Sequence, residues 1–134
     1  MDFNFKHLTK IYISGPTGCG KTWFVRRILE EQLIKPLPTI IIWVYSEWQS
    51  DYEHVWATFP HVEFVDGWRE DLYSSIRPAD RNLIILDDQM DGAGDSKTLS
   101  KLFTKGSHHR NLKVIYLVQN VLHQSKSQRT VSLN

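Results

Sequence analysis

The chain has 134 residues, enough for one domain with a buried core, and its 41% hydrophobic and 23% charged residues are ordinary for a globular protein. This composition excludes a disordered tail, a collagen-like fibre and a coiled coil, and no apolar run reaches the roughly 18 residues that a membrane span requires, so we expect no membrane partner. Lys and Arg number 16 against 15 Asp and Glu, so the net charge of +1 does not by itself indicate a nucleic-acid partner, and the single cysteine fits an intracellular, reducing compartment.

Short apolar runs alternate with amphipathic stretches along the chain, which is typical of a parallel α/β fold. Pro36 and Pro38 are expected to end the first helix, and Ser50 with Glu53 resembles a capping box at the start of the second. The polar tail over residues 123–134 gives no clear prediction. The expected strands cover residues 10–15, 39–45, 62–65, 82–87 and 114–118, and the expected helices cover residues 21–35, 51–58, 69–76 and 96–105.

Residues 15–22 (GPTGCGKT) match the phosphate-binding pattern G-x-x-x-x-G-K-[ST] in full, between an expected strand and an expected helix. Glycines let such a loop curl so that its N–H groups point at phosphate oxygens, and the following helix adds its positive end. Lys21 would reach the β- and γ-phosphates, and the Thr22 hydroxyl would ligate Mg²⁺. We therefore expect the loop to bind ATP with Mg²⁺, and a chance glycine-rich turn is the alternative. The residues of this candidate phosphate site are Gly15, Pro16, Thr17, Gly18, Cys19, Gly20, Lys21 and Thr22.

Two acids follow the apolar run of residues 82–87 (NLIILD). Asp87 falls at the carboxyl end of the expected strand, where ligands bind in open α/β sheets, so we expect it to hold Mg²⁺. Asp88 comes next and could act as general base for the attacking water. The alternative is that one or both acids only begin the following turn.

Gln119 ends the strand expected over residues 114–118. If this strand lies between the first strand and the strand of Asp87, the Gln119 amide would sit beside the γ-phosphate and orient the attacking water. Otherwise it is an ordinary loop residue. An intervening strand of this kind defines the additional-strand (ASCE) division of P-loop proteins. The chain contains no N-K-x-D motif, which disfavours GTP.

Three segments resemble, in order and spacing, the viral genome-packaging ATPases of the FtsK–HerA class, above all the poxvirus-type branch of large DNA viruses and Maverick/Polinton elements. They are GPTGCGKTWFVRRIL, LIILDDQM and LFTKGSHHRNLKVIYLVQN, and the resemblance extends from about residue 9 to residue 134. In that family the first acid ligates Mg²⁺, the second polarises water and the strand-terminal Gln senses the γ-phosphate. The resemblance thus implies these roles for Asp87, Asp88 and Gln119. Many members carry Glu at the second acid position, where this chain has Asp88.

The resemblance implies one P-loop NTPase domain over residues 1–134, a three-layer α/β sandwich with a mostly parallel sheet of the additional-strand type. It also implies an Mg²⁺-dependent ATPase motor that packages double-stranded DNA into viral capsids as a homo-oligomeric ring in an infected cell. Such rings complete each site with an arginine from the neighbouring subunit, for which Arg110 and Arg129 are the candidates. In this family a further core strand follows close behind residues 129–134. We therefore expect a C-terminally truncated domain that lacks this strand and leaves the first strand unpaired at that edge.

A basic stripe is the remaining candidate feature. Lys97, Lys101 and Lys105 recur at every fourth position of the helix expected over residues 96–105. They could contact DNA phosphates, or they could form a solvated helix face whose lysines suit the negative end of the helix.

Two rival functions stay open. One is a nucleotide-binding module with a structural or regulatory role that no longer turns over ATP, which the Asp88 departure keeps in play. The other is a small P-loop kinase, although a kinase would usually need an arginine-rich lid, and none is evident in the sequence.

Overall fold

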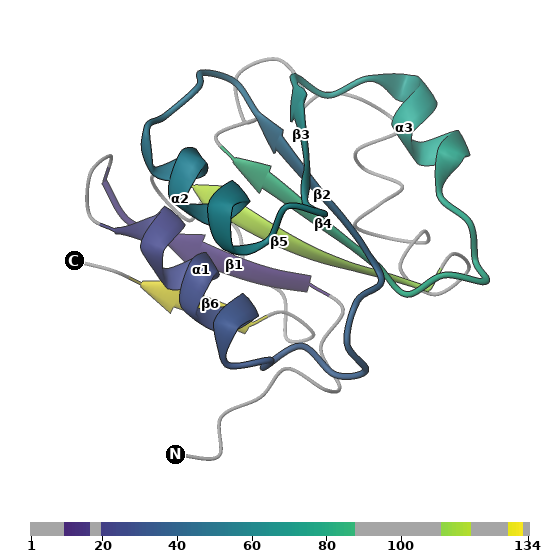
Figure 1. The fold of residues 1–134 in the computed structure, drawn as a ribbon, viewed down its shortest axis with the longest axis horizontal. Coiled ribbons are helices and arrows are strands. Elements are labelled where there is room, and N and C mark those ends of the chain that lie inside the picture. Colours follow the sequence, from purple (N-terminus) through teal and green to yellow (C-terminus); the bar gives the residue numbers. More distant parts are fainter. Residues whose placement is uncertain (1–9, 17–19, 88–110, 119–128, 133–134) are drawn as a thin grey trace.

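The computed structural model describes residues 10–16, 20–87, 111–118 and 129–132, and every structural statement below concerns these residues. They form a six-stranded sheet with the strand order β3-β2-β4-β5-β1-β6, in which every neighbouring pair of strands is parallel (Figure 1). The elements in chain order are β1 (Lys10–Ser14), α1 (Lys21–Glu30), β2 (Ile40–Tyr45), α2 (Asp51–Thr58), β3 (Glu63–Asp66), α3 (Glu70–Ser75), β4 (Asn82–Asp87), β5 (Leu112–Val118) and β6 (Arg129–Ser132).

Two apolar cores cover the two faces of the sheet, which gives the expected three layers. Helices α1 and α2 cover one face (Figure 1). There Ile28 and Val55 belong to the same core cluster as Leu83 and Ile85 of β4. The opposite face carries a second core, to which α3 contributes Leu72. Every residue of β4 is buried, as expected for a parallel strand covered on both faces, and this burial explains its uninterrupted apolar run.

The position of β5 is the topological feature that matters for function. β5 pairs with β1 on one side and with β4 on the other, so it separates the strand before the phosphate loop from the strand of Asp87. In this register Ser14 lies opposite Val118, and Asp87 lies opposite Leu117. The condition that defines the additional-strand class is therefore met, and the carboxyl ends of β1, β5 and β4 meet at one edge, called here the carboxyl edge.

The expectation that β1 lacks a partner at the edge of the sheet is wrong. β6 pairs in parallel with β1, with Arg129 opposite Ile11 and Ser132 opposite Ser14. The sequence of β6 (RTVS) did not predict a strand, because it has no apolar pattern. Backbone hydrogen bonds can hold an edge strand without such a pattern. The pairing supplies partners for backbone groups of β1 that would otherwise be exposed at the edge.

The end of α1 and the cap of α2 differ from the expectation. Helix α1 ends at Glu30, five residues before the expected end, because Gln32 adopts a left-handed conformation (φ 54°) and the Leu33 N–H donates to the Ile28 carbonyl at 3.1 Å. This is a helix-terminating bond pattern that acts before the prolines are reached. The capping box expected at α2 is absent from the described residues, since the Ser50 side chain makes no capping bond. The helix expected over residues 96–105 lies outside the described part of the chain.

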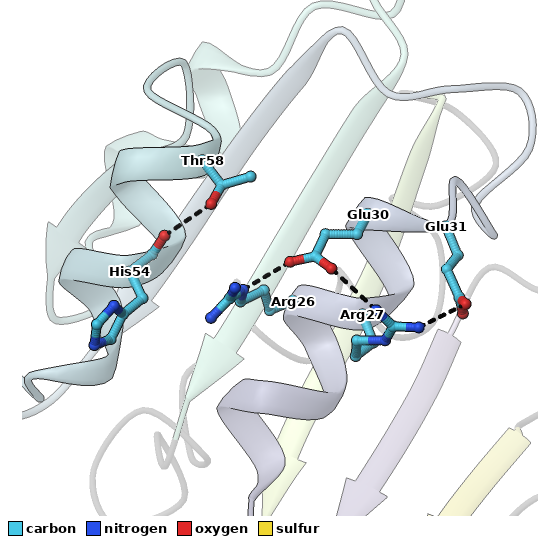
Figure 2. Close-up of polar contacts among 6 residues, drawn as sticks. All are labelled: Arg26, Arg27, Glu30, Glu31, His54 and Thr58. Carbon is cyan, nitrogen blue, oxygen red and sulfur yellow. Dashed lines mark hydrogen bonds and ion pairs between the residues drawn. The ribbon is translucent and has the colours of Figure 1, made fainter.

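Ion pairs connect two arginines and two glutamates along the outer surface of α1 (Figure 2). The Arg26 Nε donates to Glu30 at 2.7 Å, and Arg27 contacts Glu30 at 3.3 Å and Glu31 at 2.8 Å. The hydrogen bond from Arg26 is the main reason why the pKa of Glu30 lies below its ordinary value of 4.5. Because the folded-state pKa is lowered, these contacts contribute fully above pH 4.5 and weaken as the pH falls through the lowered value.

Candidate nucleotide-binding site

The candidate phosphate loop (residues 15–22, called below the phosphate loop) begins at the end of β1 and leads into α1. The Gly15 N–H donates to the Val118 carbonyl at 3.0 Å, which fixes the start of the loop against the end of β5. Gly20, the N-cap of α1, has φ 97° and ψ 21°, a region in which glycine pays no side-chain penalty. Thr17, Gly18 and Cys19 lie outside the described residues.

Gly20→Ala is expected to lower the free energy of unfolding by about 1–2 kcal/mol, the usual cost of a left-handed backbone at a non-glycine residue. An added Cβ at Gly20 would meet nothing within 4 Å, so the loss would report backbone strain and not a clash. Denaturant unfolding measures it. Gly67→Ala is the matched control, because Gly67 also has positive φ (80°) and open space but follows β3 at the outer part of the sheet. Both variants should lose stability, and only Gly20→Ala should lose nucleotide affinity; equal nucleotide affinities would contradict the assignment of Gly20 to the phosphate loop.

The first turn of α1 has the features of an anion site. The first four N–H groups of an α-helix have no partner within the helix, and here no acidic residue in the first turn and no capping side chain of a described residue competes for them. Thr22 lies in this turn with its side chain buried. Thr22 follows Lys21 directly in the chain, and its role as a metal ligand stays a prediction.

Lys21 lies at the junction of β1 and β5. It is 93% buried, and its Nζ donates to the Gly15 carbonyl at 2.9 Å and to the Val118 carbonyl at 3.3 Å. Gly15 follows the last residue of β1, and Val118 is the last residue of β5. The ammonium group therefore lies at the carboxyl edge. A buried cation thus lies at the edge where open α/β sheets bind ligands.

Asp87 ends β4 on the other side of β5 and is 97% buried. It belongs to the alternating set of β4 side chains that face α1 and α2, as do Leu83 and Ile85. The Tyr52 hydroxyl of α2 donates a hydrogen bond to Asp87 Oδ2. Sequence reasoning missed Tyr52, since no motif links an aromatic residue on α2 to an acid 35 positions later.

The donor chemistry of the site fits Mg²⁺. Thr22 and Asp87 offer a hydroxyl and a carboxylate, the hard oxygen donors that this ion prefers. The described residues contain no group of three or more His, Cys, Asp or Glu that could hold a metal ion. Mg²⁺ is usually held by one or two carboxylates together with substrate phosphates and water, so a single acid with a phosphate loop is a sufficient protein contribution.

Several predicted site residues are not placed. Arg129 begins β6, where its backbone lies beside Ile11, toward the end of the sheet opposite the phosphate loop. Its assignment as an arginine finger stays a prediction. Besides the three loop residues named above, the predicted residues that lie outside the described part of the chain are Asp88, Gln119, Arg110, Lys97, Lys101 and Lys105.

Solved structures that resemble this chain in fold include P-loop ATPases. The ATPase DotB of Legionella pneumophila aligns with a TM-score of 0.52 and 17% identity over 85% of this chain and 31% of its own. The genome packaging NTPase B204 of Sulfolobus turreted icosahedral virus 2, solved with ATP-gammaS, aligns with a TM-score of 0.52 and 12% identity. The alignment covers 87% of this chain and 66% of B204. EccC (ATPases 2 and 3) of Thermomonospora curvata aligns with a TM-score of 0.54 and 16% identity over 86% and 26%.

The chain has the P-loop NTPase fold. It spans between 26% and 66% of the length of these three structures. No protein-family model matches the sequence, and no curated protein matches it either. None of the helices in the described ranges combines the length and the apolar character that a membrane crossing needs. At these identities the likeness extends to the fold alone.

Proposed function

We propose that this chain binds ATP with Mg²⁺, hydrolyses it, and is the motor subunit of a ring that packages double-stranded DNA into viral capsids. The observation that carries the hydrolytic part is the position of β5. It lies between β1 and β4, with the Lys21 ammonium at its end on one side and the Asp87 carboxylate on the other. A cation for phosphate and an acid for the metal are thus placed at one edge, where open α/β sheets bind ligands.

Each residue has a defined task in this proposal. Lys21 and the first-turn N–H groups of α1 hold the β- and γ-phosphates, and Thr22 with Asp87 holds the metal. Mg²⁺, when bound, neutralises charge on the phosphate oxygens. Asp88 follows Asp87 directly and accepts a proton from the attacking water. Gln119 follows the last residue of β5 and orients that water.

The packaging part rests on the sequence resemblance, and the P-loop fold shared with a viral genome packaging NTPase supports it. In the ring, Arg110 or Arg129 would complete the site of a neighbouring subunit, and Lys97, Lys101 and Lys105 would bind DNA phosphates. The ring would act on capsid proteins inside an infected cell, where virions assemble. The lysine–phosphate contacts would weaken as salt rises. Binding releases cations condensed on the DNA, and this release is less favourable when the salt concentration in solution is high.

The test is an assay of the purified chain with ATP and Mg²⁺, with and without double-stranded DNA, followed by measurement of its oligomeric state. We expect phosphate release that DNA stimulates, with the stimulation falling as salt is raised from 50 to 200 mM, a range in which phosphate contacts lose orders of magnitude in affinity. Tight ATP binding without turnover, with or without DNA, would overturn the motor and favour an inactive module. Transfer of phosphate to an added nucleoside would favour a small kinase.

A further inference from the structure

We propose that Tyr52 is a positioning residue for Asp87, so that α2 forms part of the nucleotide site alongside α1. The inference rests on the proposed binding of ATP with Mg²⁺. It assigns a task to a residue that lies outside every motif of the chain.

The contact itself is specific. The Tyr52 hydroxyl donates to Oδ2 of Asp87, and both residues are buried, with exposed fractions of 1% and 3%. A carboxylate has about four lone-pair positions, so one bond from a fixed donor sets the rotation of the group without using up its capacity to accept. The donor comes from α2, whereas the phosphate loop leads into α1, so the two helices approach the site from separate parts of the chain.

Packing holds the hydroxyl in place. The Tyr52 ring belongs to an aromatic cluster around β2 and α2, and its neighbours approach edge-on or tilted, as aromatic pairs prefer. A ring enclosed in this way has little freedom to swing, so its hydroxyl is a rigid donor. The ring-centroid distances from Tyr52 are 5.3 Å to Trp43, 5.7 Å to Tyr45, 5.2 Å to Trp48 and 5.2 Å to Phe64.

A rigid donor on a metal-ligating carboxylate has a known consequence. Such outer partners orient the ligand, and their loss typically weakens metal affinity about 10–100-fold. A purely structural hydroxyl would affect folding alone. The distinguishing property is therefore the gain in nucleotide affinity that Mg²⁺ produces, which depends on the orientation of Asp87.

The cluster also contains a reporter. Trp48 is 46% exposed, and its ring stands edge-on to Tyr52. A change in the surroundings of the Tyr52 ring should therefore alter the fluorescence of Trp48. Trp48→Phe keeps an aromatic side chain at this position, and the difference between its signal and that of the wild type isolates this tryptophan from the other four.

The experiment measures the affinity for ATPγS twice, once with excess Mg²⁺ and once with EDTA, by calorimetry and by Trp48 fluorescence. Tyr52→Phe removes only the hydroxyl, and we expect the Mg²⁺-dependent gain in affinity to fall about 10–100-fold while affinity in EDTA stays unchanged. Tyr45→Phe is the matched control, because it removes a hydroxyl from the same cluster, and its gain should equal that of the wild type. Thermal melting without nucleotide checks that each variant is folded.

Three outcomes separate the possibilities. A reduced Mg²⁺-dependent gain in Tyr52→Phe alone supports the inference. A lower melting temperature with a wild-type gain assigns Tyr52 to folding only and overturns it. A wild-type chain that binds no ATPγS under either condition overturns the proposed function, and the inference falls with it.

Discussion

Lys21→Ala is expected to reduce ATP hydrolysis at least about 100-fold and to weaken ATP binding, because it removes the ammonium group that bonds both the phosphate loop and the end of β5. A preorganised charge in a site that excludes water is worth far more than the same charge in solvent. The methyl group of alanine cannot reach a phosphate, and the loop offers no second lysine or arginine in its sequence. Phosphate release and calorimetric ATP binding measure the two effects.

The Lys21 test needs controls for folding, since Lys21 is buried and bonds two carbonyls. Lys21→Met keeps an unbranched side chain of similar volume and removes the charge together with the two hydrogen bonds of the ammonium group. Lys35→Ala removes an exposed lysine that lies beyond the end of α1, away from the carboxyl edge, and should leave the rate unchanged. Hydrolysis at the wild-type rate by a folded Lys21→Met variant would rule out the catalytic role of the ammonium group.

Asp87→Asn is expected to lower Mg²⁺-dependent hydrolysis about 100-fold or more while ATP binding in EDTA persists. Asparagine has the shape of aspartate and can still accept a bond from the Tyr52 hydroxyl, so the change removes the charge and little else. Initial rates over a range of Mg²⁺ concentrations, together with ATP binding in EDTA, give the two quantities.

Asp66→Asn is the matched control for Asp87, because Asp66 also ends a strand at the same edge of the sheet but is exposed on the outermost strand, β3. Its rate should equal that of the wild type. Full Mg²⁺-dependent activity in Asp87→Asn would move the metal role to another acid and leave Asp87 with a structural role.

Local pattern predicted several elements with accurate bounds. The strand at Asn82–Asp87 and the helix at Asp51–Thr58 occur where the sequence places them. An uninterrupted apolar run has few alternatives in a parallel sheet, because both of its faces must be covered. The phosphate-binding role of residues 15–22 stays a prediction, which rests on particular residue types at fixed spacing.

Boundaries that depend on backbone conformation were less predictable. The end of α1 is set by the left-handed turn at Gln32, and glutamine carries no sequence signal for that conformation. The polar strand β6 gave no periodicity, because backbone bonds to β1 hold it and its side chains carry no apolar pattern.

The sequence by itself determined which reactive groups the site can contain. They are a cation and a hydroxyl in the candidate phosphate loop and an acid at the end of a buried strand. The tertiary structure alone decided how these groups meet. Parallel strands carry no local sequence mark of their order in the sheet, so the residues alone left the place of β5 open and only the family resemblance implied it. The fold shows β5 between β1 and β4, with Lys21 and Asp87 at one edge. The Tyr52 contact is of the same kind, because a hydrogen bond between residues far apart in the chain depends on the packing of α2 and leaves no local pattern.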